Sequence, residues 1–156
     1  MSTINEREAT QRQIMYHTFP VGKVVRAFVG GSLQWELGRV MEIDRKGPTG
    51  EPTGLVVCLL ADRTTLSYPF SVIAVGEESF IAEVSHEDVV REIWPIGQWA
   101  MVKLVGHDWK IATVARHTEQ GIGVDSNLGP ATFWWKDFMD DGRCSELKRI
   151  RSRYKP

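Results

Sequence analysis

The chain has few of the residues that build disulfide frameworks, metal centres or membrane spans. Its 156 residues include two cysteines, Cys58 and Cys144, too few for a disulfide framework or a paired zinc knuckle. Its four histidines are scattered without metal-binding spacing, so we expect no metal and no cofactor. No apolar run reaches the roughly 18 residues of a membrane span. The polar N-terminus also lacks the layout of a secretion signal, and we therefore expect a cytoplasmic protein without membrane contact.

Signatures of nucleotide binding and catalysis are missing too. The sequence contains no phosphate loop, dinucleotide fingerprint or nucleophile elbow. Asp137, Asp140 and Asp141 precede Gly142, but their spacing does not match a calcium loop, and turn chemistry accounts for them. Catalytic residues that are far apart in the sequence can still meet in the folded protein. We expect a protein that is not an enzyme.

Charge is nearly balanced overall but unevenly placed. The net charge is −1, with nine basic and thirteen acidic residues in 1–93 and ten and seven in 94–156. Most of the basic excess lies in the stretch 143–156, which holds six basic residues and one acidic residue. Without that stretch neither half carries the basic face of a strong nucleic-acid binder.

Two stretches of the chain repeat each other. Pro20-Val21-Gly22 leads to Trp35, and Pro95-Ile96-Gly97 leads to Trp109. Each tryptophan is followed by a small residue at plus three and a valine at plus five, and the echo continues in 54–57 and 121–124. We align 68–72 with 134–138, so the offset falls from 75 residues to 66. Solenoid repeats are shorter, at ~20–50 residues, so the pattern predicts one β-domain present twice.

Short strand patterns separated by turns fill both copies. The first has strands at 24–29, 34–43, 55–60 and 65–68 and a closing element through Val75, and the second has strands at 99–105, 109–116, 121–125 and 131–135. Such spacing predicts small antiparallel barrels. Capping patterns predict helices over 3–16 and from Ser85 to Trp94. We expect an all-β chain with a helical arm at 1–19, five-stranded barrels at 20–80 and 95–142, a linker helix at 81–94 and a basic tail at 143–156.

The tryptophan with its small residue and valine, the strand–turn–strand that follows and the closing aromatic turn resemble the SH3-like small barrels. Within them the Tudor, agenet and KOW group is the most similar, over residues 20–75 and 95–140. In Tudor domains that bind methylated lysine or arginine, an aromatic cage includes side chains from the turn between the third and fourth strands. Here those turns, 61–64 and 126–129, hold no aromatic residue, which argues against recognition of a methyl mark.

Plasmid-type dihydrofolate reductase is an SH3-like barrel that is an enzyme, and Tyr68-Pro69 resembles its closing segment. Its active-site strand carries a Val-Gln-Ile-Tyr run. The corresponding segments here, 65–68 and 131–134, do not match that run, so the enzyme alternative lacks its catalytic residues.

The six tryptophans are the main binding candidates. Trp134 and Trp135 are adjacent on one predicted strand, so we expect one in the core and the other either exposed to a partner or buried against the neighbouring barrel. We expect Trp35 and Trp109 to pack inside their barrels. The predicted binding residues are Trp99, Trp134 and Trp135, together with Lys46 in the Gly/Pro-rich loop 45–53, an insertion that the second copy lacks.

The basic tail supplies a second set of candidates. Arg149, Arg151 and Arg153 alternate with other residues, among them Ile150 and Tyr154, a pattern that suits contact with phosphates and stacking on a base. The simpler interpretation is a solvated, frayed terminus. Because the barrels are rich in aromatic residues and have no basic face, we expect a protein partner, with nucleic acid as the alternative.

Overall fold

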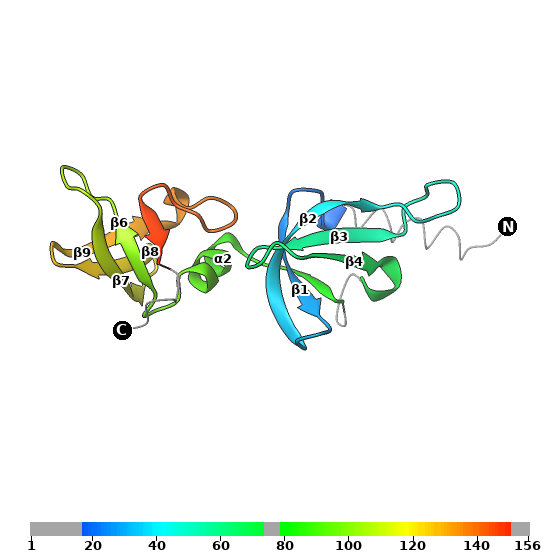
Figure 1. Cartoon of the computed structure of the whole chain (residues 1–156), viewed down its shortest axis with the longest axis horizontal. Coiled ribbons are helices and arrows are strands. Elements are labelled where there is room, and N and C mark those ends of the chain that lie inside the picture. The colour runs from blue at the N-terminus through cyan, green and yellow to red at the C-terminus, as the bar shows by residue number, and fades with distance from the viewer. Residues whose placement is uncertain (1–16, 74–78, 151–156) are drawn as a thin grey trace. The chain divides into compact units, whose positions relative to one another are not determined.

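The computed structural model describes residues 17–73 and 79–150 of the chain (Figure 1). The chain divides into two compact units, with the boundary between Val84 and Ser85. Some predicted features lie outside the described residues: the helix over 3–16, the end of the closing element at Val75, and Arg151, Arg153 and Tyr154 of the basic tail.

The first unit is a single antiparallel sheet. Its strands are β1 (Val24–Val29), β2 (Gln34–Asp44), β3 (Gly54–Leu59), β4 (Thr65–Pro69) and β5 (Ile81–Glu83), with the 3-10 turn η1 (Phe70–Val72) after β4. The hydrogen-bonded order is β4-β3-β2-β1-β5. Each strand but the last pairs with its neighbour in sequence, and β5 returns to pair with β1.

The second unit repeats this arrangement behind a helix. It contains α2 (His86–Ile93), β6 (Trp99–Val102), β7 (Lys110–His117), β8 (Gly121–Ser126), β9 (Gly129–Trp134), the 3-10 turn η2 (Trp135–Asp137) and β10 (Leu147–Arg149). The strand order, β10-β6-β7-β8-β9, corresponds strand by strand to that of the first unit. The prediction of a mainly β chain with five strands in each copy is confirmed. In the pairing of the described residues each sheet is open, with β4 and β5, or β9 and β10, at its edges.

The two sheets share their register as well as their order. Val25 lies opposite Gly38 in the first unit, and Ala100 lies opposite Ala112 in the second. A β-bulge follows Val40, which faces Val57, and the same bulge follows Val114, which faces Val124. The entry turns match too, because Gly22 donates its N–H to the Val40 carbonyl and Gly97 donates to the Val114 carbonyl, each at 2.8 Å.

Each unit has its own apolar core. The first is built from Phe19, Val25, Ala27, Val40, Leu55, Val57, Leu59, Tyr68, Ile73 and Ile81. The second is built from Val90, Trp94, Ala100, Val102, Ala112, Val114, Ile122, Val124, Phe133, Phe138, Cys144 and Leu147. In both, inward side chains alternate with outward ones along the strands, as expected of sheets with one buried face.

The register corrects the predicted alignment of the last aromatic residues. Leu55 lies opposite Tyr68, and Ile122 lies opposite Phe133, so Tyr68 corresponds to Phe133 rather than to Trp134. The predicted alignment is therefore wrong by one residue. A shift of one residue would exchange the buried and exposed faces of a strand, and the core selects the register that buries Tyr68 and Phe133.

The fifth strands begin in segments that the sequence assigned to other roles. β5 falls within the range predicted as a linker, and β10 falls within the predicted basic tail. Both are short, and each is anchored by one buried residue, Ile81 or Leu147. A three-residue strand is too short for its alternation to stand out in a sequence.

The helix α2 packs into the second unit. The Ser85 side chain accepts a hydrogen bond from the Asp88 N–H, as the capping pattern predicts. Val90 and Trp94 enter the core of the second unit, and the Trp94 indole N–H donates to the Gly142 carbonyl at 2.8 Å. The segment predicted as a spacer is therefore partly a component of the second core.

Two glycines at matching positions carry a shared steric constraint. A Cβ on Gly54 would overlap the Tyr68 carbonyl oxygen, and a Cβ on Gly121 would overlap the Phe133 carbonyl oxygen. We expect Gly54→Ala and Gly121→Ala each to lower the free energy of unfolding by about 1–3 kcal/mol, because the facing strand must move. Urea unfolding followed by tryptophan fluorescence measures the loss. The control is Gly30→Ala, whose added Cβ meets open space, and a loss equal to the control's would contradict the steric account.

Candidate functional site

Trp35 and Trp109 lie outside the two cores, contrary to the prediction that they fill them. Trp35 is 42% exposed and lies opposite Phe28 on the outer face of the first sheet. Trp109 directly precedes β7 and is half-buried. The reason is spacing, because each tryptophan lies five residues before a core valine and an odd spacing along a strand places two side chains on opposite faces.

Three aromatic side chains of the first unit form a groove on this outer face. Phe28 and Trp35 meet edge to face with 5.7 Å between ring centroids, and Phe28 and Phe80 meet at 5.3 Å. The hollow has a volume of about 440 Å³ and is lined by Phe28, Trp35, Ser79 and Phe80. Phe80, like Trp35, is exposed, at 41%. We call these four residues the aromatic groove.

Backbone and side-chain hydrogen bonds fix the position of Phe28 at the centre of the aromatic groove. Its N–H donates to the Phe80 carbonyl at 2.8 Å, which joins β1 to the residue before β5. Its carbonyl accepts from the Tyr68 hydroxyl, also at 2.8 Å. Burial, and to a lesser extent the nearby Glu36 carboxylate, raise the pKa of Tyr68. The hydroxyl therefore stays protonated and remains a donor at neutral pH.

The matching surface of the second unit has different chemistry. Lys103 and Glu146 take the places of Phe28 and Phe80, and the Lys103 N–H donates to the Glu146 carbonyl at 2.9 Å. Trp109 takes the place of Trp35. The Lys148 ammonium lies 4.5 Å from the centroid of the Trp109 ring, within the range of a cation–π contact. The tryptophan is retained, and a lysine of the same unit covers it.

The adjacent tryptophans Trp134 and Trp135 are separated by the end of a strand. Trp134 is the last residue of β9 and is 49% exposed, whereas Trp135 begins η2 and packs against the edge of the core. The expected strand through Trp135 therefore ends one residue early, and the core position next to the pair belongs to Phe133.

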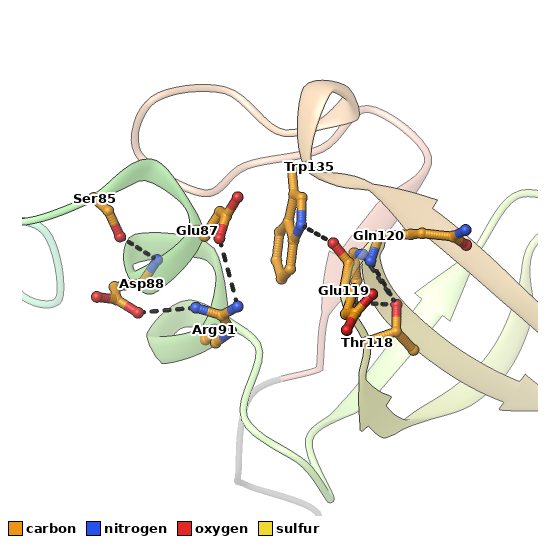
Figure 2. A network of polar contacts seen from close by, with 9 residues as sticks. Ser85, Glu87, Asp88, Arg91, Thr118, Glu119, Gln120 and Trp135 are labelled. Atoms are coloured by element: carbon orange, nitrogen blue, oxygen red, sulfur yellow. Dashed lines mark hydrogen bonds and ion pairs between the residues drawn. The ribbon is translucent and has the colours of Figure 1, made fainter.

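Trp135 is held between α2 and the loop before β8, as Figure 2 shows. Its indole N–H donates to the Glu119 carbonyl at 2.9 Å, and the Arg91 guanidinium lies 4.8 Å from its ring centroid. Arg91 is in turn oriented by Glu87 and Asp88. These contacts give Trp135 a structural role within its unit. Trp134 is the more exposed of the pair, and the Lys136 ammonium lies 5.9 Å from its ring centroid.

The other predicted binding residues lie in separate places. Trp99 is exposed at the start of β6, and Arg149 in β10 donates to the Gln98 side-chain oxygen at 3.2 Å. These two lie on neighbouring strands, but Arg149 pairs with Ala100, so the Trp99 side chain points to the opposite face of the sheet. Lys46 belongs to the first unit, where it forms a 3.4 Å ion pair with Asp44 beside the insertion loop.

The structure offers no metal centre among residues 17–73 and 79–150, where no three His, Cys, Asp or Glu side chains gather. The aspartates considered from the sequence have other partners, since Asp137 accepts from the Trp134 N–H and Asp141 pairs with Arg143. Within the same described residues, no helix has the length and apolar character to cross a membrane.

Of the four residues of the aromatic groove, sequence reasoning placed Trp35 in the core and missed Phe28, Ser79 and Phe80. The signal for Phe28 is present, because Phe28 and Trp35 flank the turn 30–33 and a hairpin there must bring them together. Phe80 has no such local signal. The search for aromatic residues covered the turns 61–64 and 126–129, whereas the rings gather beside the first hairpin of the first unit.

The chain was compared with family models, curated proteins and solved structures. No family model matches the chain, and no curated protein matches it significantly. A solved structure with some similarity is the extended Tudor domain TD3 of mouse TDRD1, in complex with a MILI peptide containing dimethylarginine 45. It is 14% identical, with 95% of this chain and 81% of that chain covered, and its TM-score is 0.28.

The contacts of Trp135 and Trp134 predict opposite mutational effects. Trp135→Ala removes a hydrogen bond, a cation–π contact and packing against the core, and we expect it to lower the free energy of unfolding by about 2 kcal/mol. Trp134→Ala at an exposed position should cost less than about 0.5 kcal/mol. Urea unfolding of both variants measures the difference, and equal losses would contradict this assignment.

Proposed function

We propose that the chain is a non-enzymatic binding protein that engages a protein partner through the aromatic groove of its first unit. The observation that carries the proposal is the exposure of Trp35 and Phe80 at either side of Phe28. Large aromatic side chains held rigid at a surface are typical anchors of protein interfaces, because they bury much area at a small entropic cost.

The dimensions of the groove suit part of a polypeptide. Its volume of about 440 Å³ lies within the usual range for binding pockets. Rings supply most of the lining, and Ser79 adds a hydroxyl that donates to the Ile81 carbonyl. The rings meet one another and are tied to the backbone of β1, so a ligand would meet a surface that is already ordered.

We further propose that each unit is an SH3-like small barrel and that the two arose by duplication. The strand order, the 3-10 turn after the fourth strand and the matching bulges support this. Equivalent folds do not imply equivalent sites, however. The first unit keeps three aromatic residues where the second has Lys103, Trp109 and Glu146, so we assign peptide binding to the first.

The nucleic-acid alternative rests on the basic tail. The structure places its first part in β10, where Lys148 meets Trp109 and Arg149 meets Gln98. A test by truncation must therefore keep β10 and end the chain at Ile150. If the residues beyond it contact phosphates, binding to nucleic acid should depend steeply on salt and fall on truncation.

Selection from a phage-displayed random peptide library tests the proposed function. The full chain should enrich a peptide family that binds it, and Trp35→Ala or Phe80→Ala should lower the affinity at least tenfold, as loss of an interface anchor does. Met139→Ala, which truncates an exposed apolar side chain of the second unit, is the control and should leave affinity unchanged. Failure to enrich any peptide that depends on Trp35 and Phe80 would contradict the proposal.

A further inference from the structure

In the second unit, the outward-facing Trp109 is covered by the side chain of Lys148. Lys148 in β10 lies opposite Met101 in β6, and Met101 lies opposite Ile111 in β7. The Lys148 side chain therefore reaches across β6, and its ammonium lies 4.5 Å from the centroid of the Trp109 ring. A cation within about 6 Å of an indole face is attracted by the negative face of the ring.

The first unit has the same tryptophan but not the lysine. Register places Ala82, opposite Arg26, at the position that Lys148 occupies opposite Met101. Ala82 is too short to reach Trp35 and carries no charge. Among residues 17–73 and 79–150, Trp35 has a ring contact with Phe28, and no lysine or arginine lies over its ring. Arg26, which lies between Ala82 and Leu37 on the same face, is engaged in interactions of its own.

The surroundings of Trp35 favour a positive charge further. Phe28 and Phe80 replace Lys103 and Glu146 of the second unit and add two ring faces beside the indole. The negative faces of the rings attract a cation and repel an anionic side chain.

We propose that the aromatic groove takes a basic side chain, lysine or arginine, from the protein partner, in the place that Lys148 fills inside the second unit. This inference rests on the proposed function and specifies its ligand. It also explains the difference between the units: the second is occupied by its own lysine, and the first is open to a lysine or arginine of another chain.

The test uses small probes that differ in charge alone. Acetyl-arginine N-methylamide and acetyl-citrulline N-methylamide have similar shape, but only the first is a cation. Each is titrated into the full chain while the indole N–H signal of Trp35 is followed by NMR and assigned with Trp35→Phe. We expect the arginine probe to bind roughly three- to thirty-fold more tightly than the citrulline probe.

Two variants test the role of the lysine, one by adding it beside Trp35 and the other by removing it from Trp109. Ala82→Lys should let the first unit cover its own tryptophan and weaken binding of the arginine probe by a similar factor, whereas Ala82→Gln, one atom shorter than lysine and neutral, should not. Lys148→Ala should open the second unit, so that the arginine probe also shifts the Trp109 indole signal. The NMR spectrum of each variant reports whether its fold is intact.

Equal binding of the arginine and citrulline probes would overturn the inference, as would equal effects of Ala82→Lys and Ala82→Gln. Either result would reject the basic ligand without rejecting the proposed function. Library peptides that require Trp35 and Phe80 but contain no basic residue would still support peptide binding by the aromatic groove. Enrichment of a lysine or arginine that cannot be replaced by glutamine in those peptides would support both.

Discussion

The bulge in the second strand of each sheet sets the arrangement of the rest. It lies after Val40 in β2 and after Val114 in β7, and it shifts the alternation of faces by one residue. In β2, residues on both sides of the bulge therefore point into one core. Val40 faces Val57, and three residues later Ile43, which packs at the edge of the same core, faces Leu55. An even alternation without the bulge would turn Ile43 outward. The core therefore fixes the register, and the register fixes which side chains remain outside.

The aromatic groove consists of side chains that this register leaves outside the core. Once Val40 is inside, Trp35 must be outside, and its partners Phe28 and Phe80 follow from the pairing of β1 with β2 and β5. The same logic places Trp109 outside in the second unit, where β10 supplies Lys148. One fold thus presents an aromatic groove in one copy and a lysine-covered tryptophan in the other, through changes at a few outward positions that leave the core intact.

Much of the fold could be predicted from the sequence, because the repeat, the strand alternation and the Pro-x-Gly entry turns are local patterns. The outward position of Trp35 was also predictable, since its odd spacing from Val40 requires it. What the sequence could not supply is contact between segments far apart in the chain. The approach of Phe80 to Phe28 and of Lys148 to Trp109 depends on three-residue strands that pair with the first strand of each sheet.

The central claim is that equivalent tryptophans are open in one unit and covered in the other. Hydroxyl-radical oxidation of the free protein, quantified at each tryptophan by mass spectrometry, measures this directly. Trp35 should react at a rate close to that of exposed Trp134, buried Trp94 should be protected, and Trp109 should react slowly until Lys148→Ala uncovers it. A Trp109 that reacts as fast as Trp35, or that is unaffected by Lys148→Ala, would contradict the account.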